Sequence, residues 1–394
     1  MEYKTIKELC DLVVDCPHST PTWTEHGKIV IRNNNIKNGR IDFTSPSFTD
    51  DEHFAQRIKR AIPKAGDIVI TREAPMGEVG MIPEGIECCL GQRMVLLRAN
   101  ERICDKHYLL YGLQSQVVQH QISWSEGTGT TVSNLRIPHL EQIRVPYVPL
   151  DQQKKISSVL YALEDKIENN RKLNDNLEQQ ATAYFQELFV ANANPNWKIG
   201  TISDLGTVTG GSTPSKAKPE YYTDNGIAWI TPKDLSMNKS KFISHGETDI
   251  TELGLKNSSA SIMPEGTVLF SSRAPIGYIA ISSGEVTTNQ GFKSVVPKSE
   301  IGAAFVYFFL KHNLPTIEGA ASGSTFKEVS GSTMKNIPAI VPDASTLEKF
   351  NDFCSTLFEK QKTLEQENQH LAFLRDTLLP KLMSGEMDVS SIQL

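Results

Sequence analysis

The chain has 394 residues, of which 39% are hydrophobic and 22% charged, and its formal net charge is −6. This composition is that of a folded protein of two or three domains, and it excludes a collagen-like or wholly disordered chain. The N-terminal eight residues lack the apolar core of a signal peptide, and the densest apolar stretch, 303–310, is far shorter than a membrane span. Six irregularly spaced cysteines without a Cys-x-x-Cys pair predict free thiols, so we expect a cytoplasmic protein.

The chain contains a two-fold internal repeat of about 195 residues. Residues 66–77 align without a gap with 266–277, sharing both glycines and the Ala-Pro pair. The match extends in both directions, since 31–36 aligns with 230–235 and 129–131 with 323–325. A repeat of this length predicts two copies of one domain rather than a short-period solenoid.

Each copy has the same internal order. Short β-like runs at 68–70 and 268–270 are each followed by an Ala-Pro-x-Gly turn signal, in which Gly77 and Gly277 are predicted turn residues. Gly/Ser/Thr-rich loops come next, at 127–131 and 321–325. We therefore predict two mixed, β-rich domains, named domain 1 (residues 1–150) and domain 2 (residues 194–342).

A long helix is predicted after each domain, at 151–193 and, with the C-terminal tail, at 343–394. Apolar residues alternate at spacings of four and three, which is the heptad pattern of a coiled coil. We expect the two helices to form an antiparallel coiled coil, giving an α+β fold of two domains separated by a helix pair. Asn174 and Asn368 occupy equivalent seam positions and are predicted to fix the register. In the alternative arrangement, each helix packs on its own domain.

Motifs of catalysis are missing from the sequence. It has no phosphate-binding loop, no dinucleotide-binding glycine pattern, no His-Glu-x-x-His and no Gly-x-Ser-x-Gly. The segment Asn194-Pro195-Asn196-Trp197 departs from the Asn-Pro-Pro-aromatic box of amino-methyltransferases at its third position and is interpreted as a linker. We therefore expect a binding and assembly protein without catalytic residues and without a metal site.

Several phrases of the sequence, taken together, carry a family resemblance. Domain 2 contains Gly-Gly-Ser-Thr-Pro-Ser at 210–215, Glu-Tyr-Tyr at 220–222 and Ile-Ala-Trp-Ile-Thr-Pro-Lys-Asp-Leu at 227–235. Domain 1 contains Asp-Cys-Pro-His-Ser-Thr-Pro at 15–21, and the second helix ends in Leu-Pro-Lys-Leu-Met-Ser-Gly-Glu-Met-Asp-Val at 379–389. Over essentially its full length the chain resembles the specificity subunit of type I restriction–modification systems.

This resemblance implies two target-recognition domains, each reading one half of a split, asymmetric double-stranded DNA target. The helices would set the spacer and dock two methylation subunits, which restriction subunits then join. S-adenosylmethionine, ATP and Mg would belong to those partners, and this subunit would have no enzymatic activity and no membrane contact. A stand-alone coiled-coil adhesion or carbohydrate-binding protein, and a nuclease or methyltransferase with an unrecognised site, are the alternatives.

Candidate DNA-binding residues are the polar and basic side chains beside the duplicated strands. Arginine can bind guanine, and Asn or Gln can bind adenine, through two hydrogen bonds in the major groove. The candidates are Arg32, Asn33, Asn34, Asn35, Lys37, Arg72 and Arg93 in domain 1, and Lys233, Lys239, Arg273, Gln290 and Lys293 in domain 2. In the alternative interpretation they are solvated loop residues or phosphate contacts, and Trp229 is expected in the core.

Overall fold

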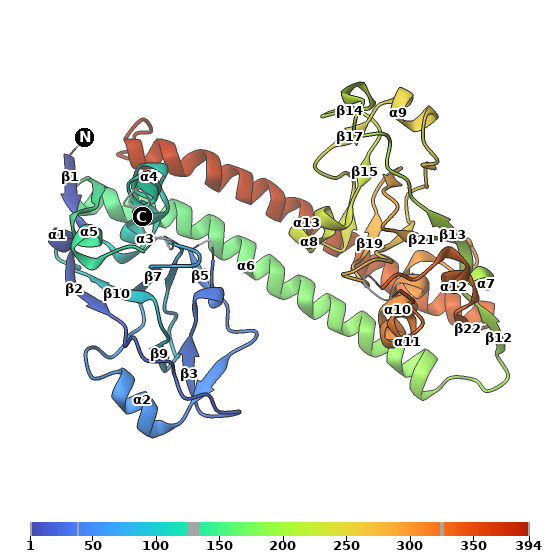
Figure 1. The fold of residues 1–394 in the computed structure, drawn as a ribbon, viewed down its shortest axis with the longest axis horizontal. Helices are drawn as coiled ribbons and strands as arrows, with labels where there is room; N and C mark the ends of the chain where they lie inside the picture. Colours follow the sequence, from blue (N-terminus) through green and yellow to red (C-terminus); the bar gives the residue numbers. More distant parts are fainter. Residues whose placement is uncertain (1, 38, 125–133, 324–326, 393–394) are drawn as a thin grey trace. The chain divides into compact units, whose positions relative to one another are not determined.

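Figure 1 shows the protein as a computed structural model. The structure describes residues 2–37, 39–124, 134–323 and 327–392. The predicted loop at 127–131, and residues 324 and 325 of the second predicted loop, lie outside these ranges. Within the described ranges, no helix combines the length and the apolar character needed to cross a membrane.

The chain divides into two compact units. The first unit consists of residues 1–167 and 370–394, and the second unit of residues 168–369. Each unit contains one globular domain together with adjoining lengths of two long helices, α6 (Leu150–Gln186) and α13 (Ala344–Ser384).

Domain 1 is built on mostly antiparallel strands with short helices between them. In chain order its elements are β1 (Glu2–Thr5), α1 (Ile6–Leu9), β2 (Cys10–Asp15), β3 (Lys28–Ile31), the 3-10 turn η1 (Asn33–Asn35), β4 (Ile36–Lys37), β5 (Arg40–Ile41), β6 (Ser47–Thr49), α2 (Asp51–Arg57), β7 (Ile68–Thr71), β8 (Val79–Met81), β9 (Cys88–Leu90), β10 (Met94–Ala99), α3 (Lys106–Gln114), α4 (Gln116–Trp124), α5 (Ile137–Gln142) and β11 (Arg144–Tyr147). The main sheet has the order β2–β10–β7–β8, β3 lies between β6 and β9 in a second sheet, where β3 and β9 form a parallel pair, and β1 pairs with β11.

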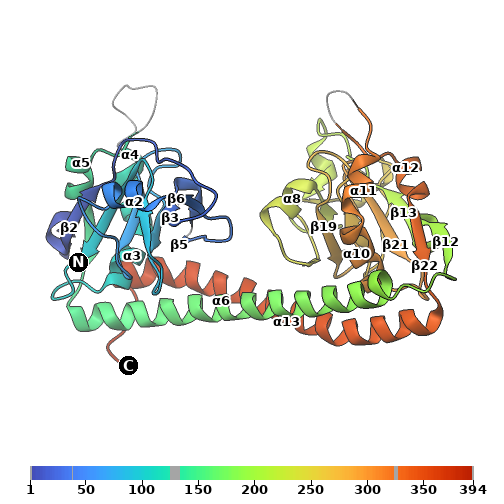
Figure 2. The same ribbon diagram turned by 90° about the horizontal axis from the view of Figure 1, so that it is seen from below.

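Domain 2 repeats this plan. After the π-helical turn η3 (Glu187–Ala191), its elements are β12 (Lys198–Thr201), α7 (Ile202–Leu205), β13 (Gly206–Gly210), the 3-10 turn η4 (Pro219–Tyr221), β14 (Tyr222–Thr223), β15 (Trp229–Ile230), α8 (Pro232–Met237), β16 (Phe242–Ile243), β17 (Asp249–Ile250), α9 (Glu252–Lys256), β18 (Val268–Phe270), β19 (Ile279–Ser282), β20 (Thr287–Thr288), β21 (Lys293–Pro297), α10 (Ala303–His312), α11 (Leu314–Gly319), α12 (Gly331–Asn336) and β22 (Pro338–Val341). Its main sheet has the order β13–β21–β18–β19–β16, and β12 pairs with β22. Helix α10 packs across β18, β19 and β21 (Figure 2).

The predicted turns after β7 and β18 are confirmed. Gly77 donates its N–H to the carbonyl of Thr71 at 2.9 Å, and Gly277 donates to Ser271 at 3.0 Å. The two glycines have φ values of +85° and +94°, which side chains other than glycine rarely adopt. The two domains therefore share backbone geometry as well as sequence.

Matching capping boxes begin the short helices that follow β1 and β12. In domain 1, Thr5 accepts from the N–H of Glu8, whose carboxylate accepts from the N–H of Thr5 at 2.7 Å. In domain 2, Asp204 accepts from the N–H of Thr201 at 2.8 Å. A hydrogen bond from Lys198 and this N–H together lower the pKa of Asp204 to about 2. The capping side chains accept hydrogen bonds from backbone N–H groups that would otherwise stay unpaired at the start of each helix.

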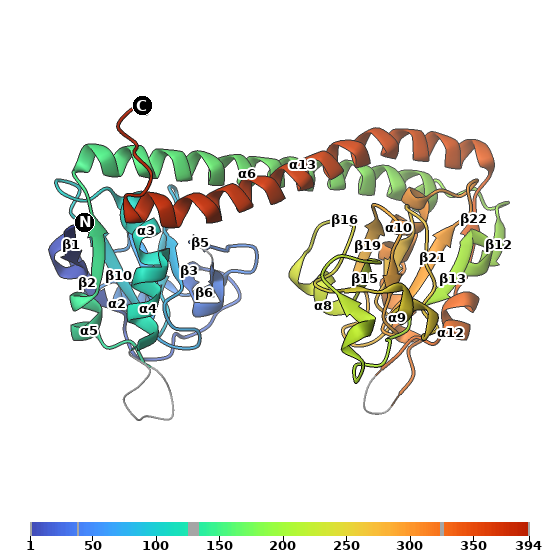
Figure 3. The ribbon, with the colours of Figure 1, turned by 90° about the horizontal axis from the view of Figure 1, so that it is seen from above.

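The helix pair is antiparallel within each unit, as predicted for a repeat related by a two-fold axis (Figure 3). In the first unit, buried Ile156 and Leu160 of α6 share an apolar cluster with Leu382 near the end of α13. In the second unit, Phe185 near the end of α6 packs against Phe350 near the start of α13, with ring centroids 5.9 Å apart. The early part of one helix thus meets the late part of the other in both units.

The polar contact in the seam differs from the one that the repeat suggests. Asn368 accepts a hydrogen bond of 3.0 Å from Asn170, not from Asn174. Counting four residues on from Asn170 and four back from Asn368 brings Asn174 opposite Leu364, which is buried. The repeat makes Asn174 and Asn368 equivalent, but in an antiparallel pair equivalent residues lie on opposite sides of the crossing and do not meet. Their predicted role in fixing the register is not tested by this contact.

Candidate nucleic-acid interface

The asparagine run after β3 divides into structural and exposed residues. Asn35 is buried, accepts from the N–H of Arg32 at 2.9 Å and donates to the carbonyl of Asp42 at 3.1 Å. Asn33 donates to the carbonyl of Glu73 at 2.7 Å. The Asn35 amide therefore holds the turn η1 together, and the half-buried Asn33 amide ties that turn to residue 73.

Three candidates of the same segment are exposed. Arg32, Asn34 and Lys37 all lie on the surface of domain 1. The Arg32 guanidinium lies 5.2 Å from the ring centre of Trp23, which is itself half exposed. An arginine stacked on an indole keeps its hydrogen-bond donors available at the edge, so Arg32 can still reach an acceptor.

The guanidinium group of Arg72 forms its hydrogen bonds within domain 1. Its side chain is 11% exposed and forms two hydrogen bonds of 2.9 and 3.0 Å to the carboxylate of Asp15. It also donates to the carbonyl of Leu135 at 2.9 Å and to Asn134 at 3.1 Å. Arg93 differs, because it pairs with Glu73 at 3.2 Å while 56% of its side chain stays exposed.

The candidates of domain 2 are mostly paired with acidic side chains at the surface. Lys233 lies 2.5 Å from Glu247, and Arg273 and Lys293 lie 3.0 and 3.5 Å from the carboxylate of Glu328. The pairs of Lys233 and Arg273 are exposed and therefore weak, so they can exchange for phosphate, whereas the Lys293 side chain is only 16% exposed. Lys239 and Gln290 are exposed. The structure thus places these residues without testing the predicted DNA contacts.

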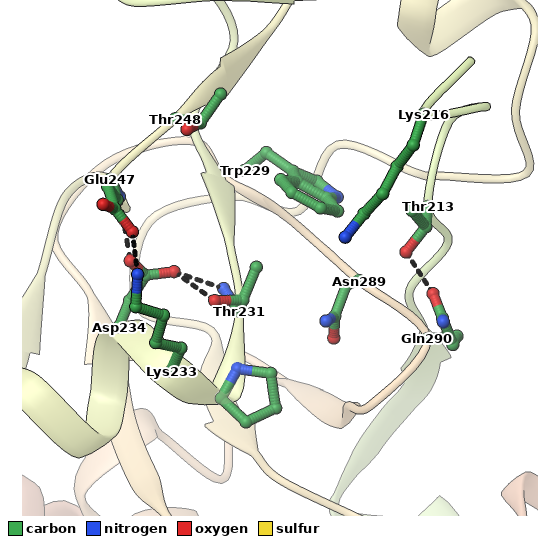
Figure 4. A pocket seen from close by; sticks show the side chains of 11 residues that line it. Thr213, Lys216, Trp229, Thr231, Lys233, Asp234, Glu247, Thr248, Asn289 and Gln290 are labelled. Atoms are coloured by element: carbon green, nitrogen blue, oxygen red, sulfur yellow. Dashed lines mark hydrogen bonds and ion pairs between the residues drawn. The ribbon is translucent and has the colours of Figure 1, made fainter.

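Domain 2 also contains a polar hollow of about 480 Å³ (Figure 4). We use this name for the cavity lined by Thr213, Lys216, Trp229, Thr231, Pro232, Lys233, Asp234, Glu247, Thr248, Asn289 and Gln290. Trp229 is 7% exposed, as expected for a core residue, and its indole N–H donates to the carbonyl of Ser212 at 3.0 Å. Figure 4 shows Lys216, Asn289 and Gln290 around the hollow from two different segments.

Sequence reasoning included Lys233 and Gln290 of this hollow but missed Lys216, Asn289 and Thr213. The Gly/Ser/Thr/Pro composition of 210–215 predicts a turn, but it does not predict which distant segment that turn contacts. Two backbone hydrogen bonds bring the segments of the hollow together, since Ser212 donates its N–H to the carbonyl of Thr288 at 2.9 Å and Asn289 donates to that of Ile230 at 3.0 Å.

In the described ranges, no group of three or more His, Cys, Asp or Glu side chains is placed to hold a metal ion. All six cysteines are free thiols, and five of them are buried. Burial raises the pKa of Cys88 to about 12 and that of Cys89 to about 11, so these thiols stay protonated and unreactive near neutral pH.

Comparison with known proteins agrees with the sequence resemblance. The sequence profile described as "Type I restriction modification DNA specificity domain" matches residues 1–179 and 194–372. The type I restriction enzyme MjaIX specificity subunit of Methanocaldococcus jannaschii is 38% identical over 191 residues, a match that spans 46% of this chain and 44% of that relative. The HindI specificity subunit of Haemophilus influenzae is 24% identical over 407 residues, spanning 84% of this chain and 88% of that relative.

A solved structure shows the same fold. The S subunit of a type I restriction–modification system from M. genitalium matches 97% of this chain and 95% of its own length, with 19% identity and a TM-score of 0.61. The family profile matches once in each structural repeat and covers most of the chain. The chain therefore belongs to the family of type I restriction–modification DNA specificity proteins.

Proposed function

We propose that the chain is the DNA-recognition subunit of a type I restriction–modification complex and has no catalytic activity of its own. The observation that carries this proposal is the double match of the specificity profile, once over residues 1–179 and once over residues 194–372. Each match includes one β-rich domain and the helix that follows it. Two recognition domains in one chain suit a DNA target made of two separate halves.

The divergence between the domains supports an asymmetric target. At the backbone position where domain 2 has Asn289, domain 1 has Gly91, and both donate their N–H to an equivalent carbonyl, that of Ile230 or Ile31. One site presents a carboxamide and the other presents no side chain. Because base pairs are distinguished by their donor and acceptor patterns, different side chains on the same scaffold select different bases.

Partner subunits supply the chemistry in this proposal. Two methylation subunits dock on the helices and hold S-adenosylmethionine, and restriction subunits that join them use ATP and Mg. Large apolar side chains on the helices support a docking role, since Tyr161 of α6 and Phe373 of α13 are 50% and 67% exposed. Surface aromatic residues of this kind are common in protein interfaces. The helix pair would also set the spacer between the two half-sites.

A reconstitution experiment tests the proposal. The chain is co-expressed with the methylation subunit of its own system in a host without DNA methylation, and the host genome is sequenced for methylated adenine and cytosine. We expect one split asymmetric motif that appears only when both proteins are present. If the chain alone transfers methyl groups from labelled S-adenosylmethionine to DNA, the non-catalytic assignment is wrong. A chain that neither binds the methylation subunit nor directs methylation would instead favour the adhesion alternative.

A further inference from the structure

We propose that the polar hollow of domain 2 binds acceptor atoms of the DNA target, with Lys216, Asn289 and Gln290 as the donors. This inference rests on the proposed function and assigns part of it to particular residues. Guanine O6 and N7 in the major groove and phosphate oxygens share the required chemistry, because both present acceptors without donors.

The two carboxamides are held so that their NH2 groups remain available. The Oδ1 atom of Asn289 accepts the backbone N–H of Gly291 at 2.8 Å, and a backbone N–H can only donate. The Oε1 atom of Gln290 accepts the hydroxyl of Thr213. Each amide oxygen is therefore engaged, and in the described part of the chain neither NH2 group has a hydrogen-bond partner.

Lys216 adds a positive charge to these donors. Its side chain is exposed and extends beside Trp229 in Figure 4, and it has no acidic partner among the described residues. Lys233, the other cation of the hollow, is already paired with Glu247. The unpaired charge of the hollow therefore lies at Lys216, next to the two amides.

The two acidic side chains of the hollow, Asp234 and Glu247, are each engaged within the domain, Glu247 by Lys233. Asp234 accepts from the N–H and hydroxyl of Thr231, at 2.7 and 2.6 Å, and from the N–H of Glu247 at 2.8 Å. With both acidic side chains engaged and the NH2 and ammonium donors available, the hollow favours a ligand rich in acceptors. The exocyclic amino groups of adenine and cytosine are donors and cannot accept a hydrogen bond from the NH2 groups of the hollow.

Domain 1 does not offer this donor set. Its residues at the corresponding positions are Gly91 and Gln92, and the amide of Gln92 donates to the carbonyl of His18. The inference therefore concerns the half-site read by domain 2 and leaves the half-site of domain 1 unaffected.

Isosteric substitutions in the assembled complex test the inference. Asn289→Asp and Gln290→Glu keep the engaged oxygen and replace the NH2 donor with an acceptor, and Lys216→Met removes the charge while keeping the length of the chain. The matched control is Lys218→Met, which changes an exposed lysine of the same segment that does not line the hollow. Each variant is co-expressed with the methylation subunit, the methylome is sequenced, and DNA binding is measured as a function of salt concentration.

We expect each hollow variant to lower methylation of the original target by about ten-fold or more, which is the discrimination typical of one good base contact. If the ligand is guanine, one position of the domain 2 half-site becomes relaxed or changes, and the other half-site is retained. If the ligand is a phosphate, the motif is unchanged and binding weakens at all sites. The slope of log affinity against log salt concentration then falls by about one for Lys216→Met.

The inference is overturned if the motif, the affinity and the salt dependence of all three variants equal those of wild type and of Lys218→Met. Lys216→Met keeps the test valid if an amide variant fails to fold, since Lys216 is exposed and supports no buried contact. Wild type separates this inference from the proposed function: if the wild-type complex directs no methylation, the proposed function itself has failed.

Discussion

The Nζ atom of Lys241 lies 2.5 Å from Oε2 of Glu178, inside the second unit and largely shielded from water. Lys241 belongs to domain 2, Glu178 to α6, and Lys241 also donates to Gln361 of α13 at 2.6 Å. Burial lowers the pKa of Lys241. Burial alone would raise the pKa of Glu178, but Lys241 and Lys311 together hold it below its usual value. One buried ammonium group therefore joins domain 2 to both helices.

Removal of that ammonium group should destabilise the second unit strongly. Lys241→Ala leaves the buried carboxylate of Glu178 with one partner fewer, and breaking a buried pair on one side costs about 3 kcal/mol or more. The measurement is urea denaturation of the full chain. The double variant Lys241→Met/Glu178→Gln, which removes both charges, should recover most of the loss.

The matched control acts on the same carboxylate from the surface. Lys311 also lies 2.5 Å from Glu178, but 47% of its side chain is exposed. Lys311→Ala should therefore cost about 1 kcal/mol or less. Equal losses for Lys241→Ala and Lys311→Ala would show that the buried position of Lys241 has no special role.

The seam asparagines should behave unequally. Asn170 and Asn368 bond to each other, whereas the side-chain oxygen of Asn174 is buried without a partner among the described residues. Asn174→Leu should raise the melting temperature, because it removes a buried, unsatisfied polar atom that costs about 1 kcal/mol or more of stability. The double change Asn170→Leu/Asn368→Leu should keep or raise stability while allowing other helix alignments, which disulfide trapping between introduced cysteines would detect. A lower melting temperature for Asn174→Leu would contradict this account.

Arg72 should prove structural and not a reader of bases. Arg72 uses three nitrogens to bond Asp15, Leu135 and Asn134, whereas a lysine has only one, so Arg72→Lys should destabilise domain 1 without changing the DNA motif. Arg93→Ala, in contrast, removes an exposed side chain and should leave stability within about 0.5 kcal/mol of wild type. Thermal denaturation and the methylome of both variants provide the measurement. A changed motif with unchanged stability for Arg72→Lys would reverse the assignment.

The helix pair should act as a ruler for the spacer. One heptad inserted between Asn170 and Asn174, with another between Leu364 and Asn368, keeps both facing pairs opposite each other and the seam in phase. Each helix becomes longer by about 10 Å, the length of about three base pairs. Binding selection from a DNA library with fixed half-sites and varied spacers should then favour a longer spacer. The added base pairs also rotate one half-site by about 100°, so affinity should fall. An unchanged preferred spacer would show that the helices do not set the distance.

Periodic signals in the sequence were sufficient for much of the architecture. The heptads predict both helices and their pairing, because an apolar seam must be buried, and the two-fold repeat predicts that the pair is antiparallel. The repeat likewise predicts matching turns at Gly77 and Gly277. The pairing of Asn170 with Asn368 could not be inferred in this way, since sequence equivalence and spatial contact differ in an antiparallel pair.

Individual contacts were less accessible to sequence reasoning. Arg72 and Asn33 are residue types that often contact DNA. In this fold Arg72 instead bonds the carboxylate of Asp15, and Asn33 bonds the backbone carbonyl of Glu73, and both partners are distant in sequence. The hollow depends on residues near 213, 231 and 289, and no local pattern links them. Such a site can be identified only when the tertiary fold is known.

Exchange of domain 1 tests the central claim most directly. A chimera carries residues 1–149 of a relative with a different target, joined to α6 and the rest of this chain, and its methylome is compared with those of both parents. The account predicts a hybrid motif in which one half-site comes from the relative, the other is unchanged and the spacer is retained. A motif altered in both halves would contradict two independent recognition domains in one DNA specificity subunit.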